Sequence, residues 1–173
     1  ARALPLSVAA ANWMASAMLI AQHHRDTLLV DVGTTTTDVI PIVAGRVDAV
    51  GRTDPERLAS GELVYSGAVR TPVEAIVREA PVDMVMTRVS AEGFALTGDV
   101  HVWLGDLAPE DYDAATPDGR PATRPFAGER LARVVCADCE MLDGRAIDRL
   151  AQHVAHEQVR QIADAIEQIR RRH

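Results

Sequence analysis

The sequence contains no lysine: all 18 of its basic residues are arginine. A Schiff-base mechanism and the phosphate-binding lysine of a Walker-type loop both need a lysine amine, so both are excluded for this chain. Aromatic residues make up only 3% of the 173 residues. We therefore expect a core built mainly from alanine, valine, leucine, isoleucine and methionine.

Three further absences limit which class of protein this can be: a basic surface, a membrane-spanning stretch and a set of paired cysteines. The net charge is -7, whereas a nucleic-acid surface needs a clustered basic face. The longest apolar stretch, residues 7–22, contains polar residues and is too short to span a bilayer. Two cysteines, Cys136 and Cys139, do not make a disulfide framework, and no second Cys or His pair follows at zinc-like spacing. We expect a cytoplasmic protein without nucleic-acid or membrane partners, in which both cysteines are small core or half-buried helical residues.

The start of the chain is unusual for a protein. It opens at Ala1 without methionine and passes at once, near Ser7, into a predicted helix whose apolar face includes Met18 and Leu19. We interpret the chain as part of a longer protein.

The hydrophobic pattern predicts one α/β domain over residues 1–173. Its first part is a meander of strands at 28–32, 38–43 and 46–50, antiparallel because the connections are short, with the first strand buried on both faces. The later predicted elements are a helix at 71–79 opened by a capping box, a strand at 82–89, a helix at 90–104, a long exposed loop at 106–128, a helix at 129–141, and an amphipathic helix at 147–171 with Val154 and Val159 on its buried face.

Between the first two strands lies the run Asp31-Val-Gly-Thr-Thr-Thr-Thr-Asp38. A glycine lets the backbone turn sharply and approach a ligand, and the following amides and hydroxyls form a ring of donors that matches phosphate oxygens. The alternative is an ordinary hairpin in which threonine is favoured by its β-propensity. We favour phosphate binding, with Gly33, Thr34, Thr35, Thr36 and Thr37 as the binding residues.

The two aspartates that flank this run have different predicted roles. Asp31, at the end of its strand, is placed to hold a hydrated Mg²⁺ through one carboxylate oxygen. Asp38, at the start of the next strand, is placed to orient the turn or a water molecule.

The same run resembles the second phosphate motif of the superfamily of actin, heat-shock ATPases and sugar kinases. Other segments resemble, more narrowly, the hydantoinase A-like proteins linked to tetrahydromethanopterin- and methanofuran-dependent one-carbon metabolism. These segments are Ala11-Asn-Trp-Met-Ala-Ser16, Gly61-Glu-Leu-Val-Tyr-Ser-Gly67 with Arg70-Thr-Pro72, and Asp118-Gly-Arg120 with Arg130-Leu-Ala-Arg133. The resemblance implies an actin-like, ribonuclease H-like lobe of a two-lobe protein. The family's first phosphate hairpin is absent from this chain.

The resemblance also implies a reaction. An aminomethylfuran diphosphate is joined to the phenol of a γ-glutamyl-tyramine, with loss of diphosphate, to give a methanofuran precursor. Amides, hydroxyls and Mg²⁺ stabilise the charge that builds up on a departing diphosphate. Glu62 or Asp38 is a candidate base for the phenol proton, so Asp31, Asp38 and Glu62 are the predicted catalytic residues.

Four more residues are candidates for contacting the substrate. Tyr65 is suited to stacking on an aromatic ring, and Arg70 to pairing with a phosphate or carboxylate, although a surface turn explains both equally well. Arg120 and Arg124 lie on the predicted loop and suit a lid over a charged substrate; a solvated loop is an equal alternative.

Two other functions remain open at this stage. One is an ATP-dependent hydantoinase, oxoprolinase or small-molecule kinase that uses the same turn for ATP. The other is a non-catalytic nucleotide-binding lobe that docks on a partner through its last helix. A small phosphorylated substrate is the expected partner, and a homo-oligomer is compatible with the sequence.

Overall fold

The computed structural model of the chain describes residues 12–173. These residues divide into two compact units. The chain up to Tyr65 forms the first unit together with residues 161–173, and residues 66–160 form the second. Helix α7 (Gly144–Arg170) contributes residues to both units. The predicted α/β character is confirmed, since both units combine helices with small antiparallel sheets.

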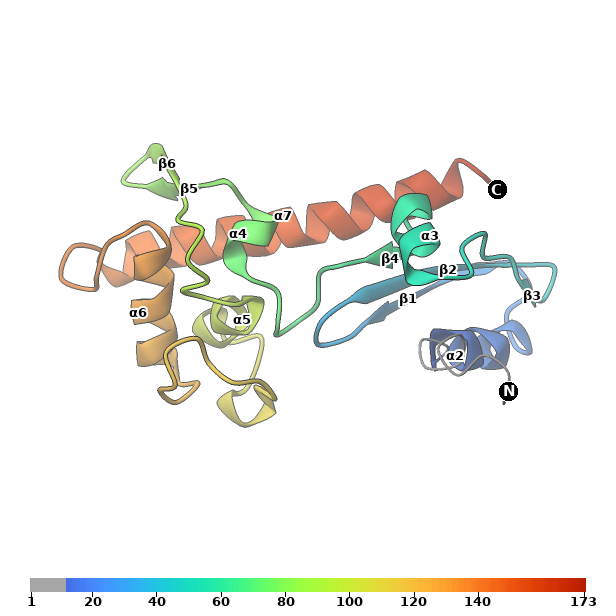
Figure 1. Cartoon of the computed structure of the whole chain (residues 1–173), viewed down its shortest axis with the longest axis horizontal. Helices are drawn as coiled ribbons and strands as arrows, with labels where there is room; N and C mark the ends of the chain where they lie inside the picture. The colour runs from blue at the N-terminus through green and yellow to red at the C-terminus, as the bar shows by residue number, and fades with distance from the viewer. Residues whose placement is uncertain (1–11) are drawn as a thin grey trace. The chain divides into compact units, whose positions relative to one another are not determined.

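The first unit is built on a sheet in which β1 (Thr27–Val32), β2 (Thr37–Val43) and β3 (Arg46–Val47) follow one another in an antiparallel meander (Figure 1). This arrangement is the predicted one, because short turns make neighbouring strands pair. A short strand that the sequence did not predict, β4 (Leu63–Val64), pairs antiparallel with the start of β2.

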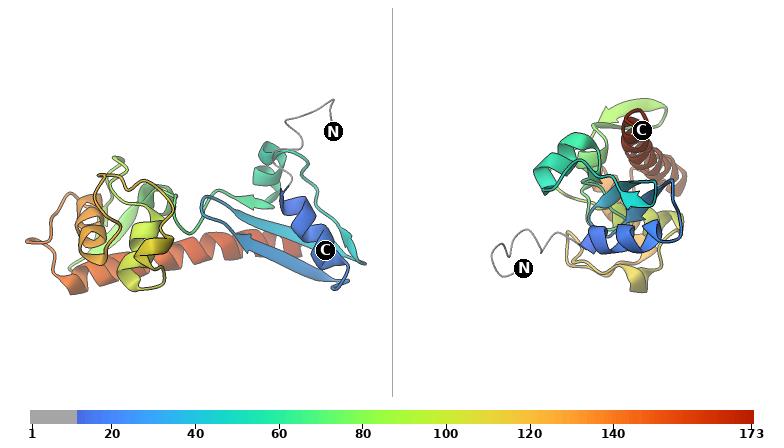
Figure 2. Two further views of the ribbon diagram at one scale, coloured as in Figure 1. Left: turned by 90° about the horizontal axis from the view of Figure 1, so that it is seen from below. Right: turned by 90° about the vertical axis from the view of Figure 1, so that its right-hand side faces the viewer.

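The two faces of this sheet carry separate hydrophobic clusters. Ile40 of β2 packs with Trp13 of α2 (Asn12–Ala21) on one face of the sheet. Figure 2 shows this helix lying against the strands. Val39, the preceding residue, packs with Ile169 of α7 on the other face. Successive side chains of a strand point to opposite faces, so the neighbouring residues Val39 and Ile40 contribute to different clusters.

Two predictions for this unit are wrong. None of the residues of β1 is fully buried, because β1 is the edge strand of the sheet and its last three residues are exposed. The apolar face predicted for the opening helix is also exposed at Met18 and Leu19, and α2 buries Trp13 and Ala17 instead. The predicted helix start near Ser7 lies outside the described residues.

Helix α3 (Asp54–Ser60) is defined by its caps. The Thr53 side chain accepts from the Glu56 amide while the Glu56 carboxylate accepts from the Thr53 amide, which is a capping box. Amides of Arg52 and Thr53 lower the pKa of Glu56. The helix ends at Gly61, whose φ of 78° is left-handed and suits glycine.

The second unit contains helices α4 (Val73–Ile76), α5 (Thr97–Leu104) and α6 (Arg124–Val134), and the hairpin of β5 (Glu79–Val82) and β6 (Val85–Arg88). Its core joins buried aliphatic residues of α5 and α6 to the first half of α7. A short 3-10 helix, Pro109–Asp111, precedes the buried Tyr112.

The boundaries of several elements in this unit differ from the predictions. The helix predicted at 71–79 is reduced to α4, because the Thr71 hydroxyl accepts from the Gly67 amide and does not cap the helix. The single strand predicted at 82–89 is a hairpin, in which Asp83 and Met84 form the turn with φ of 44° and 70°. Only the end of the helix predicted at 90–104 is helical.

The predicted exposed loop at 106–128 is shorter than expected. Helix α6 begins at Arg124, and Ala127 is fully buried. The same helix ends at Val134, where the prediction placed its middle, and Cys136 then takes a left-handed φ of 57°. Cys136 and Cys139 are therefore exposed and not helical, which corrects their assignment as core or half-buried residues.

The long final helix is confirmed as α7, with one change in its buried face. Val154 is fully buried as predicted, but Val159 is 65% exposed and Gln158 is buried in its place. Gln158 donates to the Ser66 hydroxyl and the Gly67 carbonyl and contacts the His101 ring. A buried amide is tolerated where its polar atoms are paired, and here they are.

Candidate functional site

The turn that connects β1 and β2 consists of Gly33 to Thr36. The Gly33 amide donates to the Thr36 carbonyl over 2.9 Å, which closes the turn. A Cβ atom on Gly33 would lie 3.2 Å from that same carbonyl oxygen, tighter than ordinary contact. Close approach of the backbone, and not a left-handed φ, is therefore the reason for glycine at this position.

This turn leaves hydrogen-bond donors available. Within the described part of the chain, the backbone amides of Thr34, Thr35 and Thr36 donate to no protein acceptor. All three residues are half-buried, and each carries a hydroxyl besides its amide. Thr37 differs, because it is fully buried in the pairing of β2 with β1 and β4, so we remove it from the predicted phosphate-binding residues.

The turn borders a pocket of about 340 Å³ that belongs entirely to the first unit. Four of the predicted functional residues contribute to its wall: Thr35, Thr36, Asp38 and Tyr65. The remaining lining residues come from α2, α3 and β4, namely Asn12, Trp13, Asp54, Arg57, Leu58 and Leu63. A pocket with a few convergent polar groups and aromatic walls suits a small organic ligand.

Arg57 of α3 is a pocket residue that the sequence did not indicate. Only 2% of it is exposed. Its Nη2 donates to the Asp38 carboxylate and, over 3.1 Å, to the Glu62 carbonyl, and its guanidinium lies 4.2 Å from the centre of the Trp13 ring. The ion pair and the aromatic contact together fix the guanidinium in one orientation.

Asp31 and Asp38 are directly opposite each other in the register of β1 and β2, so their side chains share the face of the sheet that α2 covers. Asp38 is half-buried and pairs with Arg57. Asp31 is exposed, and among the described residues it has no ion-pair or hydrogen-bond partner. An unpaired carboxylate beside a phosphate-sized turn fits one ligand to a hydrated Mg²⁺, which usually takes only one or two carboxylates together with substrate phosphates.

Glu62 does not have the position that a base requires. It is fully buried, and its two carboxylate oxygens accept from the amides of Val50 and Gly51, each over 2.8 Å. Arg172 lies 3.4 Å from Oε1. Both oxygens are occupied and Glu62 is not part of the pocket wall, so its carboxylate fastens the loop that precedes α3. Its catalytic role stays a prediction from the sequence.

Replacing Glu62 by Gln is expected to lower the free energy of unfolding by about 1–3 kcal/mol, because one side-chain oxygen that accepts from a buried amide becomes an NH₂ donor. Denaturation in urea followed by Trp13 fluorescence measures the effect. Glu167→Gln is the matched control: Glu167 pairs with Arg171 at the surface, and little change is expected. Equal midpoints for the two variants would contradict the clamping role.

Tyr65 is 67% exposed and follows β4 directly. The pairing of Leu63 with Asp38 and of Val64 with Thr37 brings this end of β4 beside the turn. Strand pairing therefore places Tyr65 beside the threonine turn, although 27 residues separate it from Asp38 along the chain.

The three arginines predicted to contact the substrate, Arg70, Arg120 and Arg124, belong to the second unit and pair within it. Arg70 donates to the Asp113 carbonyl over 3.0 Å. Arg124 donates to the Trp103 carbonyl and stacks on that indole ring at 4.2 Å. These contacts hold the segment onto its own unit, and no substrate role for the three residues follows from them.

Arg120 is part of a larger ionic network. Asp118 accepts from Arg120 and from Arg130, and Arg130 also pairs with Asp99 over 2.7 Å. Both Arg130 and Asp99 are fully buried. Burial raises the pKa of Asp99, while hydrogen bonds from Arg130 and the Leu96 amide offset part of that rise. For Asp118, burial alone would raise the pKa, but Arg120 and Arg130 outweigh it and lower the value.

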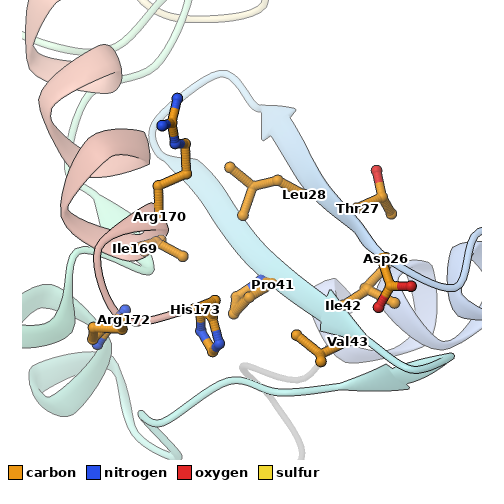
Figure 3. A pocket seen from close by; sticks show the side chains of 10 residues that line it. All are labelled: Asp26, Thr27, Leu28, Pro41, Ile42, Val43, Ile169, Arg170, Arg172 and His173. Atoms are coloured by element: carbon orange, nitrogen blue, oxygen red, sulfur yellow. The ribbon is translucent and has the colours of Figure 1, made fainter.

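A second pocket of the first unit, about 570 Å³, lies on the other face of the sheet (Figure 3). Leu28, Pro41 and Ile169 give it an apolar floor, and the side chains of Arg170 and Arg172 stand at its edge. None of the residues predicted to be functional lines it. Arg172 contacts Glu62 and His173 contacts Asp48, so these charges already have partners.

The two cysteines do not add a metal centre. Within residues 12–173, no three Cys, His, Asp or Glu side chains are grouped closely enough to hold a metal ion. Partial burial raises the pKa of the Cys139 thiol, with a further contribution from the charge of Glu129. The thiol therefore stays protonated near neutral pH.

A sequence model of the hydantoinase/oxoprolinase family matches residues 1–173. The chain therefore belongs to the hydantoinase/oxoprolinase family, as its sequence segments indicated.

Two curated proteins are similar to it. The chain is 42% identical over 145 residues to the (4-{4-[2-(gamma-L-glutamylamino)ethyl]phenoxymethyl}furan-2-yl)methanamine synthase of Methanocaldococcus jannaschii, an alignment that covers 83% of this chain and 44% of that protein. It is 41% identical over 118 residues to the synthase of the same name from Methanococcus vannielii, covering 68% and 53%. The chain spans about half the length of these relatives.

Proposed function

We propose that the protein carrying this chain is a synthase that builds an aryl ether in the biosynthesis of a methanofuran-type cofactor. The phenol oxygen of a γ-glutamyl-tyramine attacks the methylene carbon of an aminomethylfuran diphosphate. A carbon–oxygen bond forms, the bond to the diphosphate breaks, and the diphosphate leaves with the electron pair. The relatives' printed name, which describes a phenoxymethyl furan, supports this product class.

The observation that carries the proposal is the turn from Gly33 to Thr36. Its three consecutive backbone amides have no acceptor among the described residues, and Thr35 and Thr36 line a pocket with aromatic walls. Preorganised donors of this kind stabilise negative charge that accumulates on a leaving group. Ligand-sized space next to the turn leaves room for the organic part of the substrate.

The other residues of the pocket have roles that follow from their positions. Asp38 lines the pocket, whereas Glu62 is buried and occupied, so Asp38 is the predicted carboxylate that we assign to accept the phenol proton. Tyr65 is exposed at the pocket and is suited to stacking on the furan or phenol ring. A Mg²⁺ ion, when bound, neutralises charge on the diphosphate, and Asp31 is the residue that would hold it.

We further propose that the first unit belongs to an actin-like, ribonuclease H-like lobe in a two-lobe protein. The antiparallel meander that opens with the phosphate turn, and membership of the hydantoinase/oxoprolinase family, support this assignment. No helix in residues 12–173 combines the length and apolar character that a membrane crossing needs. The cytoplasmic location and the possible homo-oligomer remain predictions from the sequence.

Replacing Thr35 and Thr36 together by Val is expected to weaken pyrophosphate binding about 10-fold or more, because two hydroxyl donors are lost while shape is kept. Calorimetric titration of the protein carrying this chain with pyrophosphate and Mg²⁺ measures this. Thr27→Val, at the opposite end of the same hairpin, is the control and should bind normally. Asp31→Asn should remove the Mg²⁺ dependence of the affinity.

Two outcomes would contradict the proposal. One is pyrophosphate affinity and ether formation that are unchanged in the Thr35 and Thr36 double variant. The other is protection of the protein by ATP in preference to the furan diphosphate, accompanied by ATP hydrolysis. The second outcome would favour the ATP-dependent hydantoinase or oxoprolinase activity that the family's description suggests.

A further inference from the structure

Two nitrogens of the Arg57 guanidinium, Nη1 and Nε, have no hydrogen-bond acceptor among the described residues. A guanidinium carries five N–H groups. Nη2 serves two acceptors, the Asp38 carboxylate and the Glu62 carbonyl. Nη1 lies 3.7 Å from the Asp54 carboxylate, beyond hydrogen-bond distance, and Nε is enclosed without an acceptor among the described residues. Buried polar atoms without partners are rare in folded proteins, so these donors need an explanation.

The position of Arg57 beside the pocket explains why these donors have no partner. The residue is 98% enclosed, yet it lines the same pocket as Thr35 and Thr36, whose amides have no acceptor within residues 12–173 either. Two separate elements, the β1–β2 turn and helix α3, therefore present unpaired donors to one cavity. The Arg57 side chain carries a permanent positive charge, whereas the Gly33–Thr36 turn has no charged group.

We infer that Arg57 supplies the positive charge of a phosphate-binding site whose other donors are the amides of the Gly33–Thr36 turn. Its Nη1 binds a phosphate oxygen of the ligand, while Asp38 and Trp13 hold the guanidinium in place. This inference rests on the proposed function and adds to it a residue that neither the sequence motif nor the relatives' names assign. The ligand class is a phosphate or diphosphate ester. In the reaction, Arg57 contacts the leaving group and offsets the charge that it takes away.

The arrangement explains why an arginine is fixed so firmly at this point. The cap residue Thr53 starts α3 at a set position, and the Glu62 carbonyl and the Trp13 ring define two further points of contact. A donor that is already oriented loses little freedom when the ligand binds. The Asp38 partner removes part of the cost of keeping the cation enclosed before the ligand arrives.

Arg57→Gln should weaken pyrophosphate binding about 10- to 100-fold, because a charge-assisted hydrogen bond is lost. Arg57→Lys should recover part of the affinity, since it keeps the charge but not the fork of donors. Arg46→Gln is the control: Arg46 is exposed in β3, opposite Val43 at the end of β2, and makes the same change in net charge. Calorimetry at two salt concentrations, with circular dichroism to confirm folding, measures all four proteins.

A measurement on the unsubstituted protein tests the same inference without any change at Arg57. The guanidinium lies over the Trp13 ring, so an anion that binds to it alters the charge above the indole and should shift the Trp13 emission. The shift should be absent in Trp13→Phe and should saturate at the calorimetric dissociation constant. Pyrophosphate binding with no Trp13 signal would overturn the inference even if Arg57→Gln failed to fold.

The results separate this inference from the proposed function. If pyrophosphate binding falls in the Thr35 and Thr36 double variant but is equal in Arg57→Gln and Arg46→Gln, the phosphate turn stands and the role of Arg57 is rejected. If the unsubstituted protein binds no pyrophosphate, the proposed function fails first and Arg57 loses its ligand.

Discussion

Replacing Arg130 by Met is expected to destabilise the second unit by about 3–5 kcal/mol. Arg130 and Asp99 are both fully buried and pair over 2.7 Å, and Arg130 also holds Asp118 over 3.0 Å. Removing one partner of a buried ion pair leaves the other charge enclosed and uncompensated, which costs far more than loss of a surface pair. The loop around Asp118 loses its anchor on α6 in the same substitution.

The loss of stability in Arg130→Met should depend on pH. Burial already raises the pKa of Asp99, and removing Arg130 takes away a group that lowers it. A carboxyl group whose folded pKa lies above its unfolded value, about 3.9, contributes stability that is present below the unfolded value and lost as pH rises through the folded one. The deficit of Arg130→Met should therefore shrink as the pH falls from 7 towards 4.

Urea denaturation followed by Trp103 fluorescence in a Trp13→Phe background reports on the second unit. Glu157→Gln is the control, because Glu157 pairs with Arg160 at the surface of α7. We expect its midpoint to remain close to that of the parent. An Arg130→Met protein as stable as this control, or one whose deficit grows in acid, would show that the network contributes nothing to the fold.

The second large effect is expected for Gly51→Ala. A Cβ atom on Gly51 would lie 2.6 Å from the backbone nitrogen of Arg57 and 2.8 Å from its Cα, so either the loop or α3 must move. Overpacking of this kind typically costs about 1–3 kcal/mol. Because the Gly51 amide also donates to Glu62, the shift disturbs the clamp and the position of Arg57 together.

Thermal unfolding and pyrophosphate titration should therefore both change in Gly51→Ala. Gly144→Ala is the matched control, since a Cβ atom there meets nothing within 4 Å and alanine is a better helix residue than glycine. If Gly51→Ala unfolds at the same temperature as the control, the close packing of the loop against α3 is not a constraint in solution.

Local patterns determined which parts of the fold were predictable. The β1–β2–β3 meander follows from the short turns between its strands. Helix α7 follows from apolar residues that recur at helical spacing over a long stretch. Strand β4 has only two residues, and the information that places it lies in β2, more than 20 positions earlier. The β5–β6 turn was missed because Asp83 and Met84 take left-handed conformations without a glycine to indicate them.

The same distinction holds for the candidate site. The threonine turn was recognisable because its donors are consecutive, and Tyr65 because it belongs to a family segment. Glu62 belongs to that segment too, but its side chain faces the interior and accepts from the amides of Val50 and Gly51, which no local pattern in the segment indicates. Arg57 gave no signal, because an arginine in a short polar helix looks like any solvated residue until Trp13 and Asp38 surround it.

The makeup of the pocket wall has a consequence for how a ligand would be selected. Backbone amides, hydroxyls and a guanidinium do not change their protonation in the neutral range, and none of the described residues that line this pocket is a histidine, lysine or cysteine. Above a pH of about 5, where carboxylates are ionised, the donor side of the site keeps a constant charge. Any change in phosphate affinity across the neutral pH range should then come from ionisation of the ligand itself. The site therefore selects the fully ionised form of its ligand, and its own protonation does not change with pH in this range.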